Sequence, residues 1–188
     1  MGKRIIILNG SPRPKGNTAA LIDEFTAGAE SSGHTVTRFD LQKMHIKPCI
    51  GCCKGGKDPE SPCTQKDDMD AVYRSFKEAD IVVLASPLYF WGITGQLKTA
   101  IDRLFASMEH PEHPDGYVVP HKDCVLLMAA GSDSEENWRP ATDYYSAVVS
   151  RLDWKDLGSV LAGGVMNVGD INGKPSLAEA RTFGASIS

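Results

Sequence analysis

Ten residues that combine glycine with hydroxyl, amide and basic side chains follow the first apolar stretch of the chain. Residues 5–8 read Ile-Ile-Ile-Leu, and residues 9–18 read Asn-Gly-Ser-Pro-Arg-Pro-Lys-Gly-Asn-Thr. A helix is expected to begin at the end of this segment, and the unpaired N–H groups of a helix N-terminus favour an anion. The segment therefore predicts a phosphate site, and we call residues 9–18 the phosphate loop. Its candidate binding residues are Ser11, Arg13, Gly16, Asn17 and Thr18.

The spacing within the phosphate loop excludes two better-known nucleotide motifs. A Walker A loop needs lysine and a hydroxyl residue directly after its second glycine, whereas here Lys15 precedes Gly16. The dinucleotide fingerprint needs glycines in G-x-G-x-x-G spacing, and only Gly10 and Gly16 are present. A polar strand-to-helix turn with capping residues stays open as the alternative to a phosphate site.

Three consecutive aromatic residues form a second unusual segment, after another apolar stretch. Residues 86–95 read Ser-Pro-Leu-Tyr-Phe-Trp-Gly-Ile-Thr-Gly, and we call them the aromatic loop. Three neighbouring rings in a loop cannot all point into a core, and exposed aromatic patches mark binding surfaces. The aromatic loop therefore predicts a platform for a flat ring system. Packing of the rings on a neighbouring subunit is the alternative.

Four of the five cysteines lie within fifteen residues, at Cys49, Cys52, Cys53 and Cys63. We call residues 49–63 the cysteine loop. Four thiolates can hold a [4Fe–4S] cluster, and C-x-x-C spacing also occurs in zinc sites. Because consecutive side chains diverge, Cys52 and Cys53 are poorly placed to bind one metal. We favour a metal-free, redox-sensitive loop and keep the cluster and zinc as alternatives.

Strand-like and helix-like segments alternate along the whole chain. The expected strands are residues 5–8, 34–41, 79–85, 124–130 and 156–168, and the expected helices are 17–31, 67–77, 94–108, 137–152 and 175–183. This alternation predicts one α/β domain over residues 1–188, a doubly wound five-stranded parallel sheet with helices on both faces. Ligands of such folds bind beyond the carboxyl ends of the strands, where the loops after Leu8, Ala85 and Ala130 lie.

Composition and charge exclude several classes of function. The chain has 20 basic and 24 acidic residues, so its formal net charge is −4, which argues against nucleic-acid binding. No run approaches the roughly 20 apolar residues that span a bilayer, and no signal peptide is recognisable. We expect a cytoplasmic protein without a membrane partner.

Taken together, these segments resemble the NAD(P)H-dependent FMN reductases of the flavodoxin-like superfamily. The phosphate loop is similar to that family's G-S-[PL]-R and N-[TS] motif, and residues 87–103 are similar to its P-x-Y, G-x-L-K and I-D-R segment. Residues 49–52 and 66–69 look like the C-x-G-C and K-D-D-M stretches of its iron–sulfur flavoprotein branch. Cluster-bearing members separate their second and third cysteines by two residues, whereas Cys52 and Cys53 are adjacent here.

The resemblance implies a flavodoxin-like fold and FMN, with its phosphate on the phosphate loop and its ring against the aromatic loop. The ring-binding residues would be Pro87, Leu88, Tyr89, Phe90, Trp91 and Gly92, with Ala130, Gly131 and Ser132 closing the other side. It also implies an oxidoreductase that passes hydride from NAD(P)H through FMN to a quinone, nitro compound, metal or flavin. No catalytic side chain is expected, because the cofactor carries the chemistry. A homodimer or homotetramer is expected. The alternative is a non-enzymatic electron-transfer flavoprotein.

Overall fold

The computed structural model describes residues 2–55, 58, 60–108 and 120–188, which fold around one parallel sheet. Its strand order is β2-β1-β3-β4-β5, and every neighbouring pair is parallel. The strands are β1 (Arg4–Asn9), β2 (Thr35–Asp40), β3 (Ile81–Pro87), β4 (Asp123–Ala129) and β5 (Lys155–Ala162). This order is that of flavodoxin-like folds, so the predicted fold is confirmed.

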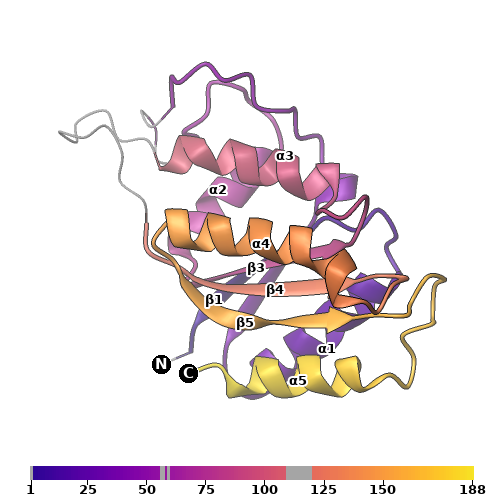
Figure 1. The fold of residues 1–188 in the computed structure, drawn as a ribbon. Coiled ribbons are helices and arrows are strands. Elements are labelled where there is room, and N and C mark those ends of the chain that lie inside the picture. Colours follow the sequence, from indigo (N-terminus) through magenta and orange to yellow (C-terminus); the bar gives the residue numbers. More distant parts are fainter. Residues whose placement is uncertain (1, 56–57, 59, 109–119) are drawn as a thin grey trace.

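Helices cover both faces of the sheet (Figure 1). Helices α1 (Asn17–Ser31) and α5 (Pro175–Ser186) lie on one face. Helices α2 (Met69–Glu78), α3 (Gly95–Leu104) and α4 (Glu135–Arg151) lie on the other. Two short 3-10 helices, η1 (Leu41–Lys43) and η2 (Phe105–Ser107), follow β2 and α3. No helix in the described ranges is long and apolar enough to cross a membrane.

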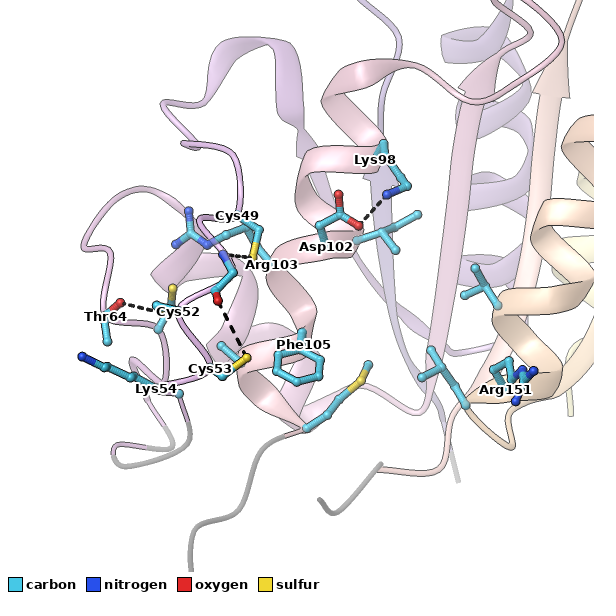
Figure 2. Close-up of a pocket in the computed structure, with 18 of the residues that line it drawn as sticks. Cys49, Cys52, Cys53, Lys54, Thr64, Lys98, Asp102, Arg103, Phe105 and Arg151 are labelled. Atoms are coloured by element: carbon cyan, nitrogen blue, oxygen red, sulfur yellow. Dashed lines mark hydrogen bonds and ion pairs between the residues drawn. The ribbon is translucent and has the colours of Figure 1, made fainter. Parts of the chain in front are cut away.

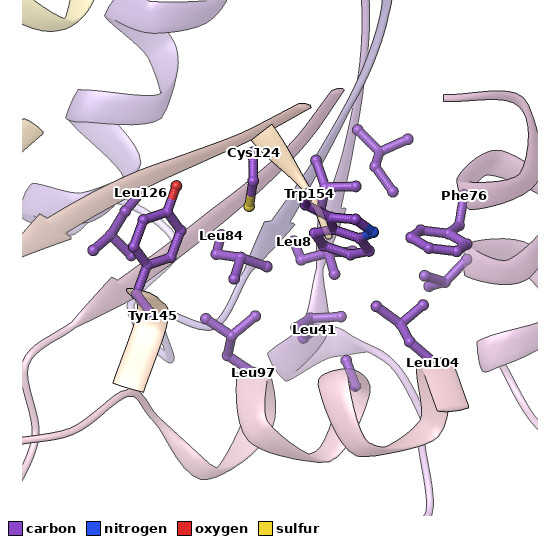
Figure 3. Packing of buried hydrophobic residues seen from close by; sticks show 14 of the residues in the cluster. Leu8, Leu41, Phe76, Leu84, Leu97, Leu104, Cys124, Leu126, Tyr145 and Trp154 are labelled. Atoms are coloured by element: carbon purple, nitrogen blue, oxygen red, sulfur yellow. The ribbon is translucent and has the colours of Figure 1, made fainter. Parts of the chain in front are cut away.

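The sheet buries a separate apolar core on each face. Ile5 and Ile7 of β1 pack with α1 and α5, whereas Ile6 and Leu8 pack with the opposite three helices. Figure 3 shows this second core, in which Leu97 and Leu104 of α3 lie among side chains of the strands and of α2 and α4. Burial on both faces explains why the strands are almost continuously apolar in sequence. Cys124 belongs to this core, and burial raises the pKa of its thiol to about 12.

The last strand and one helix differ from the sequence-based expectation. Strand β5 ends at Ala162 instead of continuing to 168, because Gly164 has a φ of +65° and Gly163 packs against Asp133, where a Cβ atom would collide. Residues 163–174 form a loop that reaches the site described below. Helix α4 begins two residues earlier than expected, so Pro140 lies in its second turn and not in its first. Residues 109–119, which the sequence assigns to neither a helix nor a strand, lie outside the described residues.

Candidate functional site

The phosphate loop leaves backbone donors free at the start of α1. Strand β1 ends at Asn9 and α1 begins at Asn17. The first three backbone N–H groups of α1, at residues 17–19, have no acceptor in the part of the chain that the structure describes. No side chain caps this end, and its first turn holds no acidic residue. The N-terminus of α1 therefore offers free donors of the kind that favour an anion.

A buried asparagine at the end of β1 fixes the position of the phosphate loop. Asn9 Oδ1 accepts a hydrogen bond from the Ser11 backbone N–H at 3.0 Å, and Asn9 Nδ2 donates to Asp40 Oδ1 at 2.9 Å. Arg38 Nε and Lys43 Nζ also donate to the Asp40 carboxylate, at 2.7 and 3.0 Å. The role of Asn9 was not predicted from the sequence. A polar residue that directly extends a buried apolar run was the signal for it.

The Asp40 carboxylate gives this support a pH dependence. Burial alone would raise the pKa of Asp40, but hydrogen bonds from Asn9, Lys43 and Arg38 outweigh it and lower the pKa from 3.8 to about 2. A lowered folded-state pKa stabilises the protein above pH 4, and this contribution is lost as the pH falls towards 2. We expect Asp40→Asn to be less stable than the wild type at pH 7, with the difference shrinking below pH 4. Urea unfolding of both proteins between pH 7 and 2 measures this difference, and a constant difference would contradict the assignment.

The aromatic loop is a tight turn held in a strained conformation. The Tyr89 and Gly92 backbones exchange two N–H···O bonds of 3.0 Å. Phe90 and Trp91 between them have φ angles of +46° and +59°, which bulky residues rarely adopt. Such strain persists only where surrounding contacts maintain it, and it is common at binding sites. The Phe90 side chain is 96% exposed, so the loop does present an aromatic surface.

Thr94 joins the aromatic loop to the phosphate loop. Its Oγ1 donates to the Gly10 carbonyl at 2.9 Å, and its backbone N–H donates to Ser86 Oγ at 3.0 Å. The Gly10 N–H in turn donates to the Ala85 carbonyl at 2.8 Å. The two loops therefore lie side by side at the carboxyl edge of β1 and β3, as the sequence predicted.

A cavity of about 360 Å³ opens between the two loops. Most predicted site residues line it, together with three that were not predicted, Ala129, Val165 and Met166. The predicted lining residues are Ser11, Arg13, Gly16, Asn17, Thr18, Pro87, Leu88, Tyr89, Phe90, Ala130 and Gly131. Trp91 and Ser132 line a neighbouring cavity of about 610 Å³, and Gly92 lines neither.

The loop at residues 163–174 closes this cavity and engages two predicted phosphate ligands. Asn17 Nδ2 donates to the Asn167 carbonyl at 2.9 Å, and Asn17 Oδ1 accepts from the Gly169 N–H at 3.2 Å. Arg13 Nη1 donates to the Met166 carbonyl at 2.9 Å. The Asn17 side chain therefore holds the loop, while its backbone N–H stays free. The sequence could not show this contact, because it joins segments 150 residues apart.

The cysteine loop is anchored by a buried ion pair between two sequence motifs. Arg103 of α3 donates to both carboxylate oxygens of Asp67, at 2.7 and 3.1 Å. It also donates to the carbonyls of Lys47 and Gln65, at 2.8 and 3.2 Å. Burial works to raise the pKa of Asp67, but the Arg103 guanidinium holds it below its usual value. The motifs K-D-D-M and I-D-R thus meet in space, and their pairing positions the cysteines.

The sulfur atoms of the cysteine loop point in different directions (Figure 2). Cys52 Sγ lies 3.4 Å from Thr64 Oγ1, whereas Cys49 Sγ accepts from the Gly51 N–H and Cys53 Sγ donates to the Gly51 carbonyl. Cys63 is buried. Among the described residues, no three Cys, His, Asp or Glu side chains are grouped as metal ligands. This arrangement does not fit an iron–sulfur cluster or a zinc ion.

A larger cavity, of about 760 Å³, lies between the cysteine loop and helices α3 and α4 (Figure 2). It shares no lining residue with the cavity of the phosphate loop, and its described lining contains no N-terminus of an α-helix. Its size alone therefore does not make it the functional site, because the free backbone donors lie in the smaller cavity.

Comparison with known proteins identifies the family. The family model for NADPH-dependent FMN reductase matches residues 3–150. The chain belongs to the NADPH-dependent FMN reductase family. An iron–sulfur flavoprotein of Archaeoglobus fulgidus is 38% identical over 179 residues, which is 95% of this chain and 76% of that protein. An iron–sulfur flavoprotein of Methanocaldococcus jannaschii is 39% identical over 102 residues, which is 53% of this chain and 51% of that protein. The match thus spans about half the length of the second relative.

Solved structures show the same fold at low sequence identity. An NAD(P)H:quinone oxidoreductase from Methanothermobacter marburgensis superposes on this family member with a TM-score of 0.76, covering 100% of both chains at 20% identity. The azoreductase AzrA gives a TM-score of 0.68, covering 98% of this chain and 100% of the other at 20% identity. These comparisons confirm both the predicted resemblance and the flavodoxin-like architecture.

Proposed function

We propose that this protein binds FMN in the cavity between the phosphate and aromatic loops and acts as an NAD(P)H-dependent oxidoreductase. Family membership supports the cofactor, and the site fits it. The free N–H groups at residues 17–19 suit an anionic phosphate, and the aromatic loop suits a planar ring. The observation that carries the proposal is that both features line one cavity. Its volume of about 360 Å³ lies within the roughly 300–1,000 Å³ of ligand sites.

The residues of this cavity bind and orient; they do not transfer protons. When bound, FMN would supply hydride acceptance from a nicotinamide and hydride donation to an acceptor. Among the described lining residues, only Arg13 and Tyr89 are ionisable. The Thr18 hydroxyl has no hydrogen-bond partner in the described part of the chain, so it is free for the phosphate. Apolar groups of Leu88, Ala130 and Val165 line the cavity and would exclude water from a bound ring.

Kinetics of flavin reduction separate the proposed enzyme from an electron-transfer carrier. Purified protein loaded with FMN is mixed anaerobically with NADH or NADPH, and flavin absorbance is followed. We expect rapid bleaching, followed by steady-state nicotinamide oxidation once a quinone, nitro compound, ferric salt or free flavin is added. Protein that binds FMN but is not reduced by either nicotinamide would contradict the enzyme and favour the carrier.

Removing one aromatic ring from the cavity is expected to weaken FMN binding. Tyr89 lines the cavity and is 43% exposed without ligand, so its ring is available for stacking. We expect Tyr89→Ala to weaken FMN binding by about 1–3 kcal/mol, the usual loss for a stacking partner, and Tyr89→Phe to retain most of the affinity. Titration by flavin fluorescence measures both. Phe105→Ala is the control. Phe105 is similarly exposed, at 40%, but it lines the cavity of about 760 Å³ beside the cysteine loop. Equal affinity of all three variants would contradict the platform.

A further inference from the structure

Four of the five cysteines line the cavity of about 760 Å³ beside the cysteine loop. They are Cys49, Cys52, Cys53 and Cys63. All four are free thiols, and among the described residues they are not grouped as metal ligands. The proposed FMN site uses none of them, because the two cavities share no lining residue. These thiols are therefore available for chemistry of their own.

The contacts of the sulfur atoms distinguish the thiols from one another. Cys52 Sγ lies 3.4 Å from the hydroxyl oxygen of Thr64, and a hydroxyl can donate to a thiolate. Cys53 Sγ instead donates to the Gly51 carbonyl, a contact that requires the thiol proton. Cys63 is buried, which restricts the access of a reagent from solvent. Cys52 is thus better placed than either neighbour to react as a thiolate.

Two groups of Lys54 add to the stabilisation of a thiolate at Cys52. The Thr64 hydroxyl, the Lys54 backbone N–H and the charge of the Lys54 ammonium lower the pKa of the Cys52 thiol below its ordinary value. Among the described residues, Cys49 Sγ accepts one hydrogen bond, from the Gly51 N–H at 3.4 Å. Because the thiolate is the nucleophilic form, Cys52 is the expected nucleophile of the cysteine loop.

The charged side chains around the cavity favour an anionic reagent. One carboxylate and four cations line it, at Asp102, Lys54, Lys98, Arg103 and Arg151. Lys98 pairs with Asp102 at 2.6 Å. Lys54 and Arg151 have no ion-pair partner in the described ranges, and Figure 2 shows them on opposite sides of the cavity. A cleft with an excess of one charge raises the local concentration of ions of the opposite sign.

Arg103 adds a buried donor without a partner to the wall of this cavity. Its side chain is only 1% exposed. Its two terminal nitrogens donate to Asp67, Lys47 and Gln65, but its Nε has no hydrogen-bond partner in the described part of the chain. Buried donors are nearly always satisfied, so an unpaired one indicates a missing acceptor. A carboxylate on a molecule in the cavity can supply that acceptor.

We propose that the cysteine loop is a thiol-modification site, at which Cys52 undergoes thiol–disulfide exchange with small aromatic disulfides that carry carboxylates. The Cys52 thiolate attacks one sulfur of the disulfide, a new S–S bond to Cys52 forms, and the original S–S bond breaks. The other half of the reagent leaves as a thiolate, so the Cys52 sulfur is oxidised, the leaving sulfur is reduced, and the proton of Cys52 passes to solvent. Apolar side chains such as Ile101 and Phe105 form a wall for the aromatic part. This proposal does not rest on the proposed function.

The test compares two aromatic disulfides, the dianion dithiobis(nitrobenzoate) and uncharged dithiodipyridine. FMN-loaded protein with reduced thiols is mixed with each, without nicotinamide. Each rate constant is divided by that of N-acetylcysteine amide with the same reagent, which removes the intrinsic difference between the two disulfides. Peptide mass spectrometry identifies the modified cysteine, and iron and zinc are measured in the same preparation.

Two pairs of variants accompany the wild type. Cys52→Ser and Cys49→Ser compare two thiols of the same loop. Arg151→Gln and Arg139→Gln compare two exposed arginines of α4, of which only Arg151 lines the cavity.

We expect a single fast thiol, at Cys52, that is lost in Cys52→Ser and kept in Cys49→Ser. At low salt the normalised rate should be about tenfold higher for the dianion, and high salt should reduce this preference. Arg151→Gln should lower the rate with the dianion about threefold, and Arg139→Gln should leave it unchanged. A fast thiol at another cysteine, equal normalised rates for both reagents, or stoichiometric iron or zinc would overturn the proposal. Failure to bind FMN would overturn only the proposed function, because the thiol assay does not require flavin.

Discussion

Replacing Arg103 with methionine is expected to lower the free energy of unfolding by about 3–5 kcal/mol, the usual loss when one partner of a buried ion pair is removed. The Arg103 and Asp67 side chains are only 1% and 4% exposed, so the remaining carboxylate would be buried without its cation. The carbonyls of Lys47 and Gln65 would also lose a donor. Urea unfolding followed by circular dichroism measures the change.

Two further variants separate charge burial from side-chain packing at Arg103. The double variant Arg103→Met with Asp67→Leu should recover part of the loss, because no charge is then buried. Lys98→Met removes the exposed partner of Asp102 on the same helix, where both side chains are more than 40% exposed. That change should stay within about 0.5 kcal/mol, as for other surface pairs. A loss below about 1 kcal/mol for Arg103→Met would contradict the role of this pair as the anchor of the cysteine loop.

Gly10→Ala is expected to separate the phosphate loop from the aromatic loop. A Cβ atom at Gly10 would lie 2.4 Å from Thr94 Oγ1 and 2.7 Å from Leu97 Cβ. Both atoms belong to the start of α3, so the phosphate loop must move and the Thr94–Gly10 hydrogen bond must break. We expect a stability loss of about 1–3 kcal/mol and a weakening of FMN binding by about tenfold or more, which corresponds to about 1.4 kcal/mol.

Gly95→Ala is the matched control for Gly10→Ala. Gly95 follows Thr94 and begins α3, but a Cβ atom there would meet nothing within 4 Å. Its stability and FMN affinity should stay close to those of the wild type. If Gly10→Ala keeps wild-type affinity for FMN, or if Gly95→Ala loses as much, the contact between the two loops does not determine binding.

The fold was predictable because local patterns carry most of its information. Buried strands such as residues 81–87 are almost entirely apolar, and helices such as α3 have their apolar residues at helical spacing. Alternation of these patterns leaves few topologies. The errors lie where tertiary contacts override the pattern. Residues 165–168 include three apolar positions, as a strand would, but Val165 and Met166 line the cavity and Val168 is 60% exposed.

The site was predictable as two loops and not as a network of contacts. Positions such as Ser11 and Tyr89 could be assigned because loops that follow adjacent parallel strands meet at one edge. Asn9 and Thr94 act through hydrogen bonds to residues distant in sequence, so spacing alone could not reveal them. The ion pair of Arg103 with Asp67 was present in the sequence as two motifs, but their meeting required the fold.

The phosphate claim is tested most directly by comparing FMN with riboflavin, which has the same ring system but no phosphate. Flavin-free protein is titrated with each, and quenching of flavin fluorescence gives the two dissociation constants. We expect FMN to bind at one molecule per chain, and riboflavin to bind at least about tenfold more weakly because residues 17–19 lose their anion. Equal affinities, or no saturable binding of FMN, would contradict the account.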